Sequence, residues 1–200
     1  EEEQMENLRK MLFAMSRDIR VILIKMADRL HNMRTMEYQT PAKQKKKAFE
    51  TMEIYAPIAH RLGMQKVKWE LEDLSLKYLD PVAYDDICKK LEAASDEHDQ
   101  FMSAVQSEVN ARLEELGIPH ATVYGRVKHP YSIYRKMYAQ EKTMEELYDL
   151  FAFRVLVDTV GDCYNVLGVI HDIYKPILGR FKDYIGTPKP NMYQSLHTTV

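Results

Sequence analysis

Apolar residues near the start of the chain recur at steps of three and four positions. They are Met11, Met15, Ile19, Ile22, Met26, Leu30 and Met33. Side chains at this spacing share one face of a helix or of a helix pair, so the pattern predicts helix through about Met36. Ser16 and Asp18 are residue types that cap helix starts, and they can begin the second helix of such a pair.

The next part of the chain keeps the helical pattern and is divided by proline and glycine. A helix is expected to begin at Thr40-Pro41 and to run over residues 42–61, with an interruption or kink at Pro57. Gly63 ends this helix. Further helices are predicted over residues 67–78 and 81–116, ended by Asp80-Pro81 and by Gly117.

After Gly117 the pattern changes to short strands that alternate with helices. The predicted elements are strands over residues 122–127, 150–157 and 193–200, helices over 131–140 and 162–174, and a charged loop over 179–191. The continuous apolar run of the second strand is typical of a strand buried on both faces. We therefore expect an all-α part followed by an α/β part.

Composition narrows the class of protein. The chain has 200 residues, 46% of them hydrophobic, and this length and content are enough for a core in one or two domains. Its formal net charge is −2. Two cysteines without metal or disulfide spacing indicate a reducing cytoplasm. No apolar run reaches the length of a membrane span, and no signal peptide is visible. Both ends look cut, so we interpret the chain as an internal fragment.

The first helical region carries polar residues that could hold a ligand. Asp28 and Asn32 are four residues apart and share a helix face, with His31 beside them. Asp is a hard oxygen ligand for a divalent ion, and Asn could hold a hydroxyl or a phosphate. The alternative is a surface ion pair of Asp28 with Arg29 or Arg34, and for this segment taken alone the ion pair is the commoner arrangement.

A second polar group brackets the junction between a predicted strand and a predicted helix. Arg126 and Lys128 alternate out of the strand end and project the same way. Ser132, Arg135 and Lys136 follow on the first turns of the helix. Cations and free backbone N–H groups at such a junction form a cradle for a polyphosphate, whereas the alternative is a basic surface helix.

A single carboxylate, Asp149, directly precedes the apolar run over residues 150–157. A carboxylate at the mouth of a core strand is well placed to hold Mg²⁺ against phosphates. The alternative, a strand-edge or capping residue, is commoner for a lone Asp.

Residues 180–197 hold the densest mixture of charged, aromatic and amide side chains. Lys182 and Lys189 can neutralise phosphates, and Tyr193 can stack on a base, a contact worth about 1–3 kcal/mol per base. Hydrogen bonds to a base edge and a sugar could come from Asn191, Gln194 and His197. Locally basic segments in a nearly neutral chain favour an anionic small ligand over an extended nucleic-acid surface, although an ordinary solvated loop is the alternative.

In combination these segments resemble the Rel/SpoT family of (p)ppGpp synthetase/hydrolases. The resemblance rests on the phrases ADRLHNMRT, YAPIAHRLG, GRVKHPYSIYRK, RFKDYI and PKPNMYQSLHTTV, which together span nearly the whole chain. It implies an α + α/β fold in three regions. These are the helical C-terminal part of an HD-type hydrolase domain over residues 1–40, a helical connector over 41–80, and a partial nucleotidyltransferase-like synthetase domain with a mixed sheet over 81–200.

The resemblance also implies roles for single residues. In the hydrolase, Asp28 would be a Mn²⁺ ligand, with Asn32 and Thr35 at the alarmone nucleotide. In the synthetase, Asp149 would hold Mg²⁺, and the catalytic set would be Asp149, Arg126, Lys128 and Lys182. The ATP phosphates would be held by Arg126, Lys128, Ser132 and Lys136. GTP or GDP would be bound by Lys189, Asn191, Tyr193 and His197.

The reaction implied is transfer of pyrophosphate from ATP to the 3′-hydroxyl of GTP or GDP, with hydrolysis of (p)ppGpp in the intact protein. The upstream His and His-Asp pair of the hydrolase and the later Glu of the synthetase are not in the sequence, so we expect the fragment itself to be inactive. A non-catalytic guanine-nucleotide-binding regulatory module is the alternative. Direct binding to nucleic acid or membrane is not expected, and the oligomeric state is left open.

Overall fold

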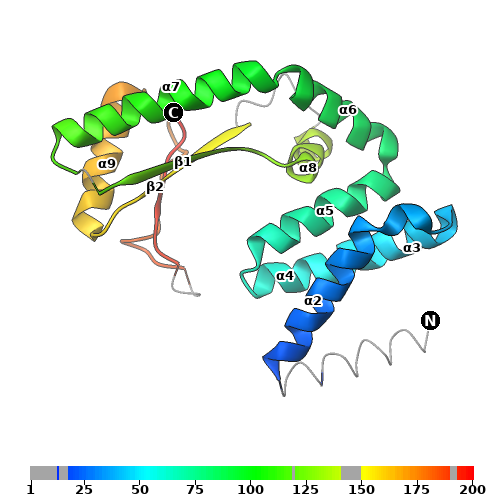
Figure 1. Cartoon of the computed structure of the whole chain (residues 1–200). Helices are drawn as coiled ribbons and strands as arrows, with labels where there is room; N and C mark the ends of the chain where they lie inside the picture. Colours follow the sequence, from blue (N-terminus) through cyan, green and yellow to red (C-terminus); the bar gives the residue numbers. More distant parts are fainter. Residues whose placement is uncertain (1–12, 14–17, 119, 141–149, 190–192) are drawn as a thin grey trace. The chain divides into compact units, whose positions relative to one another are not determined.

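The computed structural model describes residues 13, 18–118, 120–140, 150–189 and 193–200 (Figure 1). The chain divides into two compact units. The first consists of Glu1–Glu92 with His129–Tyr148, and the second of Ala93–Lys128 with Asp149–Val200. Asp149 and Asn191, two of the candidate site residues, lie outside the described residues.

The first unit is helical. Its elements are α2 (Ile19–Arg34), a 3-10 turn η1 (Met36–Tyr38), α3 (Pro41–Glu50), a π-helical segment η2 (Thr51–Tyr55), α4 (Ala56–Arg61), α5 (Gln65–Leu79), α6 (Pro81–Ala93) and α8 (Pro130–Gln140). The predicted cap at Asp18 is confirmed, because its carboxylate accepts the backbone N–H of Arg20 at 2.9 Å. The predicted helix start at Pro41 is confirmed as well.

The core of this unit contains the predicted apolar stripe of α2. The buried residues are Ile22, Met26, Met33, Met36, Ala48, Tyr55, Ala59 and Leu71. Met26 and Met33 are 1% and 0% exposed, whereas Ile19 at the first turn is 56% exposed. Helical periodicity therefore identified the buried face of α2 but not the exposure of Ile19, whereas Met11 and Met15 of the same predicted stripe lie outside the described residues.

The interruption predicted at Pro57 takes the form of the π-helical segment η2. Proline has no N–H, so the carbonyl of Glu53 lacks its α-helical donor. Just before the proline, the N–H of Ala56 donates to the carbonyl of Thr51, five residues back. The helix therefore widens by one residue instead of breaking, and it ends at Gly63, which has a φ of 72°.

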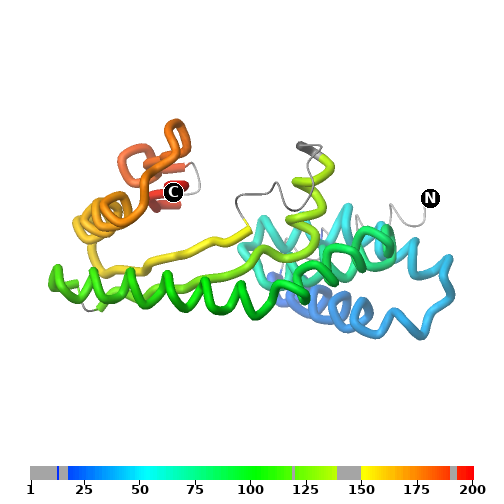
Figure 2. Tube along the Cα trace, turned by 90° about the horizontal axis from the view of Figure 1, so that it is seen from above, coloured from blue at the N-terminus to red at the C-terminus, as the bar shows by residue number. Residues whose placement is uncertain are grey.

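The second unit places helices on a narrow antiparallel ribbon. Its elements are α7 (Ser95–Glu115), β1 (Thr122–Val127), β2 (Phe151–Leu156), α9 (Val160–Ile173), β3 (Lys182–Asp183) and β4 (Leu196–His197). Figure 2 shows α7 running alongside the ribbon of β1 and β2. Side chains of α7, β1 and α9 form the core, namely Val109, Leu113, Val123, Val166 and Val169.

Two expectations about the sheet are wrong for the described residues. Instead of a mixed sheet, the described residues form two antiparallel pairs, β1 with β2 and β3 with β4. The second strand is not buried on both faces, since Arg154 is exposed and Leu156 is 50% exposed. A two-stranded ribbon with helices on one side leaves its other face accessible.

Two element boundaries also differ from the prediction. The helix expected over residues 81–116 is two helices, α6 and α7, separated at Ala94. Asp96 and Glu97 in the first turn of α7 favour a new N-terminus there. In the described residues, the strand expected over 193–200 is a regular strand at Leu196–His197, and the carbonyls of Ser195 and Thr199 also accept the N–H groups of Tyr184 and Ile177.

Candidate functional site

The exposed face of the β1–β2 ribbon carries two neighbouring arginines. Tyr124 pairs with Arg154 and Arg126 pairs with Ala152, so Arg126 and Arg154 are diagonal neighbours on the same face. Partial burial, followed by the positive charge of Arg154, lowers the pKa of Arg126. Two guanidinium groups held as neighbours repel each other, and an anion between them relieves this repulsion. This face is therefore suited to bind phosphate.

The residues predicted to hold the ATP phosphates belong to both units. The backbone N–H of Lys128 donates to the carbonyl of Leu150 at 2.9 Å, so extended pairing continues one residue beyond β1. Lys128 therefore lies on the same side of the extended segment as Arg126. Ser132 and Lys136 lie on α8 in the first unit, where the hydroxyl oxygen of Ser132 is 2.6 Å from Nε2 of His129.

A small hairpin organises the residues around Lys182. In the β3–β4 pair Lys182 lies opposite His197. The neighbouring carboxylate of Asp183 accepts the backbone N–H of Gly186 at 2.7 Å and the hydroxyl of Tyr164, on α9, at 3.0 Å. The hydrogen bond from Gly186 is the main cause that lowers the pKa of Asp183. The carboxylate thus ties the turn that follows β3 to α9.

Aromatic rings gather around Lys189. Its Nζ lies 4.3 Å from the ring centroid of Tyr184 and 5.3 Å from that of Tyr193. The hydroxyl of Tyr193 is 2.9 Å from Nε2 of His197. A cation over a π face is a favourable contact that a base could replace by stacking on the same ring.

Positive charges from both the β1–β2 ribbon and the β3–β4 hairpin act on the imidazole of His197. Its pKa is lowered by burial first, and then by the positive charges of Lys189, Lys182 and Arg154. Arg154 also acts on Arg126, so it links the ribbon face to the hairpin. One neighbourhood within the second unit therefore contains the ring of Tyr193 and five cationic or imidazole side chains. These five are Arg126, Arg154, Lys182, Lys189 and His197.

Sequence reasoning missed two members of this neighbourhood. Arg154 was absorbed into an apolar run, although a single charge within that run is the signal that one strand face is accessible. Tyr184 lies two residues after Lys182, and its position in the charged loop gave no sign that its ring would face Lys189.

Polar residues of α2 and of its C-terminal cap form an exposed stripe, as their spacing predicts. The members are Asp28, His31, Asn32 and Thr35. The ion-pair alternative for Asp28 is wrong, because Arg29 pairs with Glu50 at 2.8 Å and Arg34 pairs with Glu70. Among the described residues there is no group of three or more His, Cys, Asp or Glu side chains that could hold a metal ion. Asp28 is thus a candidate ligand without further described ligands beside it.

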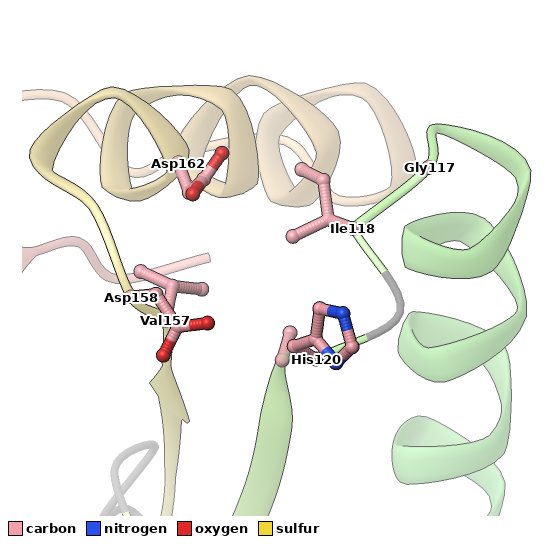
Figure 3. Close-up of a pocket in the computed structure, with 7 residues that line it drawn as sticks. Gly117, Ile118, His120, Val157, Asp158 and Asp162 are labelled. Atoms are coloured by element: carbon pink, nitrogen blue, oxygen red, sulfur yellow. The ribbon is translucent and has the colours of Figure 1, made fainter.

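A small hollow lies in the second unit away from these residues (Figure 3). It has a volume of about 90 Å³ and is lined by Gly117, Ile118, His120, Ala121, Val157, Asp158 and Asp162. Asp162 serves the start of α9, where its backbone N–H donates to the hydroxyl of Thr159 at 3.1 Å. Liquid water occupies about 30 Å³ per molecule, so the hollow suits a few waters and not a nucleotide.

Comparison with known protein families matches two separate segments of the chain. A family model described as "Region found in RelA / SpoT proteins" matches residues 125–200, and one described as "HD domain" matches residues 1–65. No helix in the described part of the chain is long and apolar enough to cross a membrane.

Curated relatives match along nearly the whole chain. A probable guanosine-3′,5′-bis(diphosphate) 3′-pyrophosphohydrolase of Synechocystis is 52% identical over 199 residues, covering 100% of this chain and 26% of the relative. A GTP pyrophosphokinase of Streptomyces coelicolor is 55% identical over 197 residues, covering 98% and 23%. A bifunctional (p)ppGpp synthase/hydrolase RelA of Mycobacterium tuberculosis is 49% identical over 195 residues, covering 98% and 26%. The chain thus spans about a quarter of the length of these relatives.

Proposed function

Since the chain belongs to the Rel/SpoT family, we propose that the protein carrying it transfers pyrophosphate from ATP to the 3′-hydroxyl of GTP or GDP. The observation that supports this most strongly is the cluster of Lys182, Lys189 and Arg154 around His197, with Arg126 next to Arg154. Two nucleoside polyphosphates bring many negative charges together, and clustered cations offset their repulsion.

In the proposed reaction the acceptor 3′-oxygen attacks the β-phosphorus of ATP, and AMP leaves. The protein aligns the two nucleotides and neutralises charge on the transferred group. We assign the ATP phosphates to Arg126, Lys128, Ser132 and Lys136. We assign the transferred group to Lys182 and Lys189, and the acceptor nucleotide to Lys189, Asn191, Tyr193 and His197.

Divalent metals serve both families that the chain matches, and we assign them to two carboxylates. Mg²⁺ bound at Asp149 would neutralise phosphate charge in the synthetase. Mn²⁺ bound at Asp28 would serve the hydrolase. Asp28 is exposed and supplies only one carboxylate, so the described residues do not by themselves form a complete metal site.

Hydrolysis of (p)ppGpp is the second activity that we propose for the protein carrying this chain. It is supported by the HD-domain match over residues 1–65 and by the exposed stripe of α2, where Asn32 and Thr35 lie one turn and two turns beyond Asp28. In that position they could contact the alarmone nucleotide.

The activities are assigned to regions of sequence. Residues 1–40 would belong to the hydrolase, 41–80 to a connector and 81–200 to the synthetase. These regions differ from the compact units, because α8 packs on α5 within the first unit.

We propose a cytoplasmic location for the protein, and we propose that the 200-residue chain by itself is inactive. If this chain binds GDP in calorimetry while the full-length protein forms no product, a regulatory nucleotide-binding module is the better description.

Substitution of Lys182 tests the proposed synthetase. In the full-length protein, Lys182→Ala should lower the rate of pppGpp formation from ATP and GTP by about 100-fold, because a cation at the transferred group is lost. Lys175→Ala is the matched control, since Lys175 is an exposed cation of the same unit that is not among the groups acting on His197. Equal rates for Lys182→Ala and the wild type would contradict the assignment.

A further inference from the structure

A carboxylate of α5 holds the start of α8. Oδ1 of Asp73 accepts the backbone N–H of Tyr131 at 2.8 Å and lies 3.0 Å from Nδ1 of His129. The side chains of Asp73 and His129 are only 20% and 14% exposed. The ring of His129 also lies against Trp69, with centroids 5.6 Å apart. The Nδ1 edge and one face of the imidazole are therefore held by residues of α5.

The same imidazole contacts Ser132 through its other nitrogen. Nε2 of His129 is 2.6 Å from the hydroxyl oxygen of Ser132. An ionised carboxylate can only accept hydrogen bonds, so the contact with Asp73 assigns the proton to Nδ1 and turns Nε2 toward the hydroxyl. In a neutral ring, Nε2 accepts a hydrogen bond from the Ser132 hydroxyl. In a charged ring, Nε2 donates a hydrogen bond to the Ser132 oxygen, and the hydroxyl can then donate to a phosphate oxygen. In either state the orientation of the Ser132 oxygen is set by His129.

The order Asp73, His129, Ser132 resembles the hydrogen-bond chain of a serine nucleophile, but the backbone beside Ser132 does not support that chemistry. The N–H groups of Ser132 and Ile133 both donate to the carbonyl of His129, at 3.0 and 3.3 Å. They are therefore committed to the helix start and cannot stabilise an oxyanion as a serine hydrolase requires.

We propose that Asp73 and His129 are positioning residues for the ATP-phosphate site, and that they act by orienting the hydroxyl of Ser132. This inference rests on the proposed synthetase function and on the assignment of Ser132 to ATP. Asp73 supports both the imidazole and the backbone of Tyr131, so it fixes the side chain and the helix turn that carry Ser132. The connector helix α5 thereby contributes to nucleotide binding without touching the nucleotide.

A second carboxylate of the same chain segment offers a matched control. Asp80 follows α5 directly and accepts the hydroxyl of Tyr134, on α8, at 3.2 Å and the backbone N–H of Ala83 at 3.1 Å. It ties α8 in place as Asp73 does, but it makes no contact with His129 or Ser132. Loss of Asp80 therefore tests the effect of weakening the attachment of α8 and the start of α6 without removing a contact to His129 or Ser132.

The test is steady-state kinetics of pppGpp synthesis by the full-length protein, with KM measured separately for ATP and for GTP. Ser132→Ala, His129→Ala and Asp73→Ala should each raise KM for ATP by about tenfold, the value of one well-made hydrogen bond, and leave KM for GTP unchanged. His129→Gln, whose amide can reach Ser132, should recover most of the ATP affinity. Asp80→Ala should lower the melting temperature and leave KM for ATP unchanged.

The double variant His129→Ala/Ser132→Ala separates positioning from a general structural effect. If His129 acts through Ser132, the double variant has the same KM for ATP as Ser132→Ala alone. Additive rises, or equal rises for ATP and GTP, overturn the inference. If Ser132→Ala raises KM for ATP but the His129 and Asp73 variants do not, only the positioning role fails. If Ser132→Ala itself has no effect, the ATP assignment fails and takes the positioning role with it.

Discussion

At the scale of single residues, the titration of the His197 imidazole reports on the positive charges of the candidate site. Burial, Lys189, Lys182 and Arg154 lower its pKa below the ordinary value of 6.5. A lowered histidine pKa means that the unfolded chain binds the proton more tightly. Its contribution to stability is therefore complete above about pH 6.5 and is lost as the pH falls toward the folded-state pKa.

We expect NMR titration of His197 to give a pKa below 6.5, and Lys189→Ala to raise it, because a nearby positive charge is removed. Pyrophosphate should raise it in the same way by neutralising Lys182 and Lys189. Lys175→Ala should leave the titration of His197 unchanged, since Lys175 is not among its perturbing charges. A pKa of 6.5 or more that is insensitive to Lys189 and to pyrophosphate would show that these groups are not neighbours.

Two substitutions of Tyr193 distinguish the contribution of its ring to nucleotide binding from that of its hydroxyl. Tyr193→Ala in the full-length protein should raise KM for GTP about tenfold or more, because stacking on a base is lost. Tyr193→Phe keeps the ring and removes the hydroxyl that contacts His197, so its KM for GTP should stay near that of the wild type. If both variants lose the same affinity, the hydroxyl and not the ring carries the interaction.

At the scale of elements, the face of β1 toward α7 leaves little room for a side chain at Gly125. A Cβ at this position would meet the flexible end of Met102, on α7, and would lie 2.9 Å from a ring carbon of Phe153, on β2. Gly125→Ala should therefore destabilise the protein by about 1–3 kcal/mol, because the core is overpacked. Urea unfolding of the 200-residue chain measures this change.

Gly168 in α9 is the matched control for Gly125. A Cβ there meets no atom within 4 Å, and the residue is within a helix. Gly168→Ala should be neutral or should stabilise the protein by up to about 1 kcal/mol. Equal effects of the two substitutions would contradict the packing of β1 on α7.

The elements that could be predicted from sequence are those set by neighbours in the chain. The cap at Asp18, the start at Pro41 and the end at Gly63 follow from the local chemistry of single residues. The widening at η2 was expected only as an interruption, because a missing N–H can be accommodated by a kink, a break or a π turn. Which of these occurs depends on packing around the segment, and η2 is flanked by the ion pair of Arg29 with Glu50 and contains Tyr55, over whose ring Arg29 lies.

Contacts between distant residues could not be predicted in this way. Asp73 and His129 are 56 positions apart, and neither forms a sequence pattern with the other. The accessible face of β2 was hidden because an apolar run does not reveal how many strands and helices cover it. Arg154 was overlooked for this reason, although it acts on both Arg126 and His197.

At the scale of the whole molecule, the chain supplies part of the machinery of a longer protein. It spans about a quarter of the relatives that it matches, and two of the assigned residues, Asp149 and Asn191, lie outside the described part of the structure. Activity therefore has to be measured on the full-length protein, whereas folding and the titration of His197 can be measured on the 200 residues themselves.

The most direct test of the central claim follows the phosphorus atoms of ATP. The full-length protein is incubated with GTP and with ATP labelled at the α, β or γ phosphate, and the products are separated. Pyrophosphate transfer predicts that the β and γ labels both appear in the guanosine product and that the α label appears in AMP. A guanosine product that carries only the γ label, or none of the three, would contradict the account.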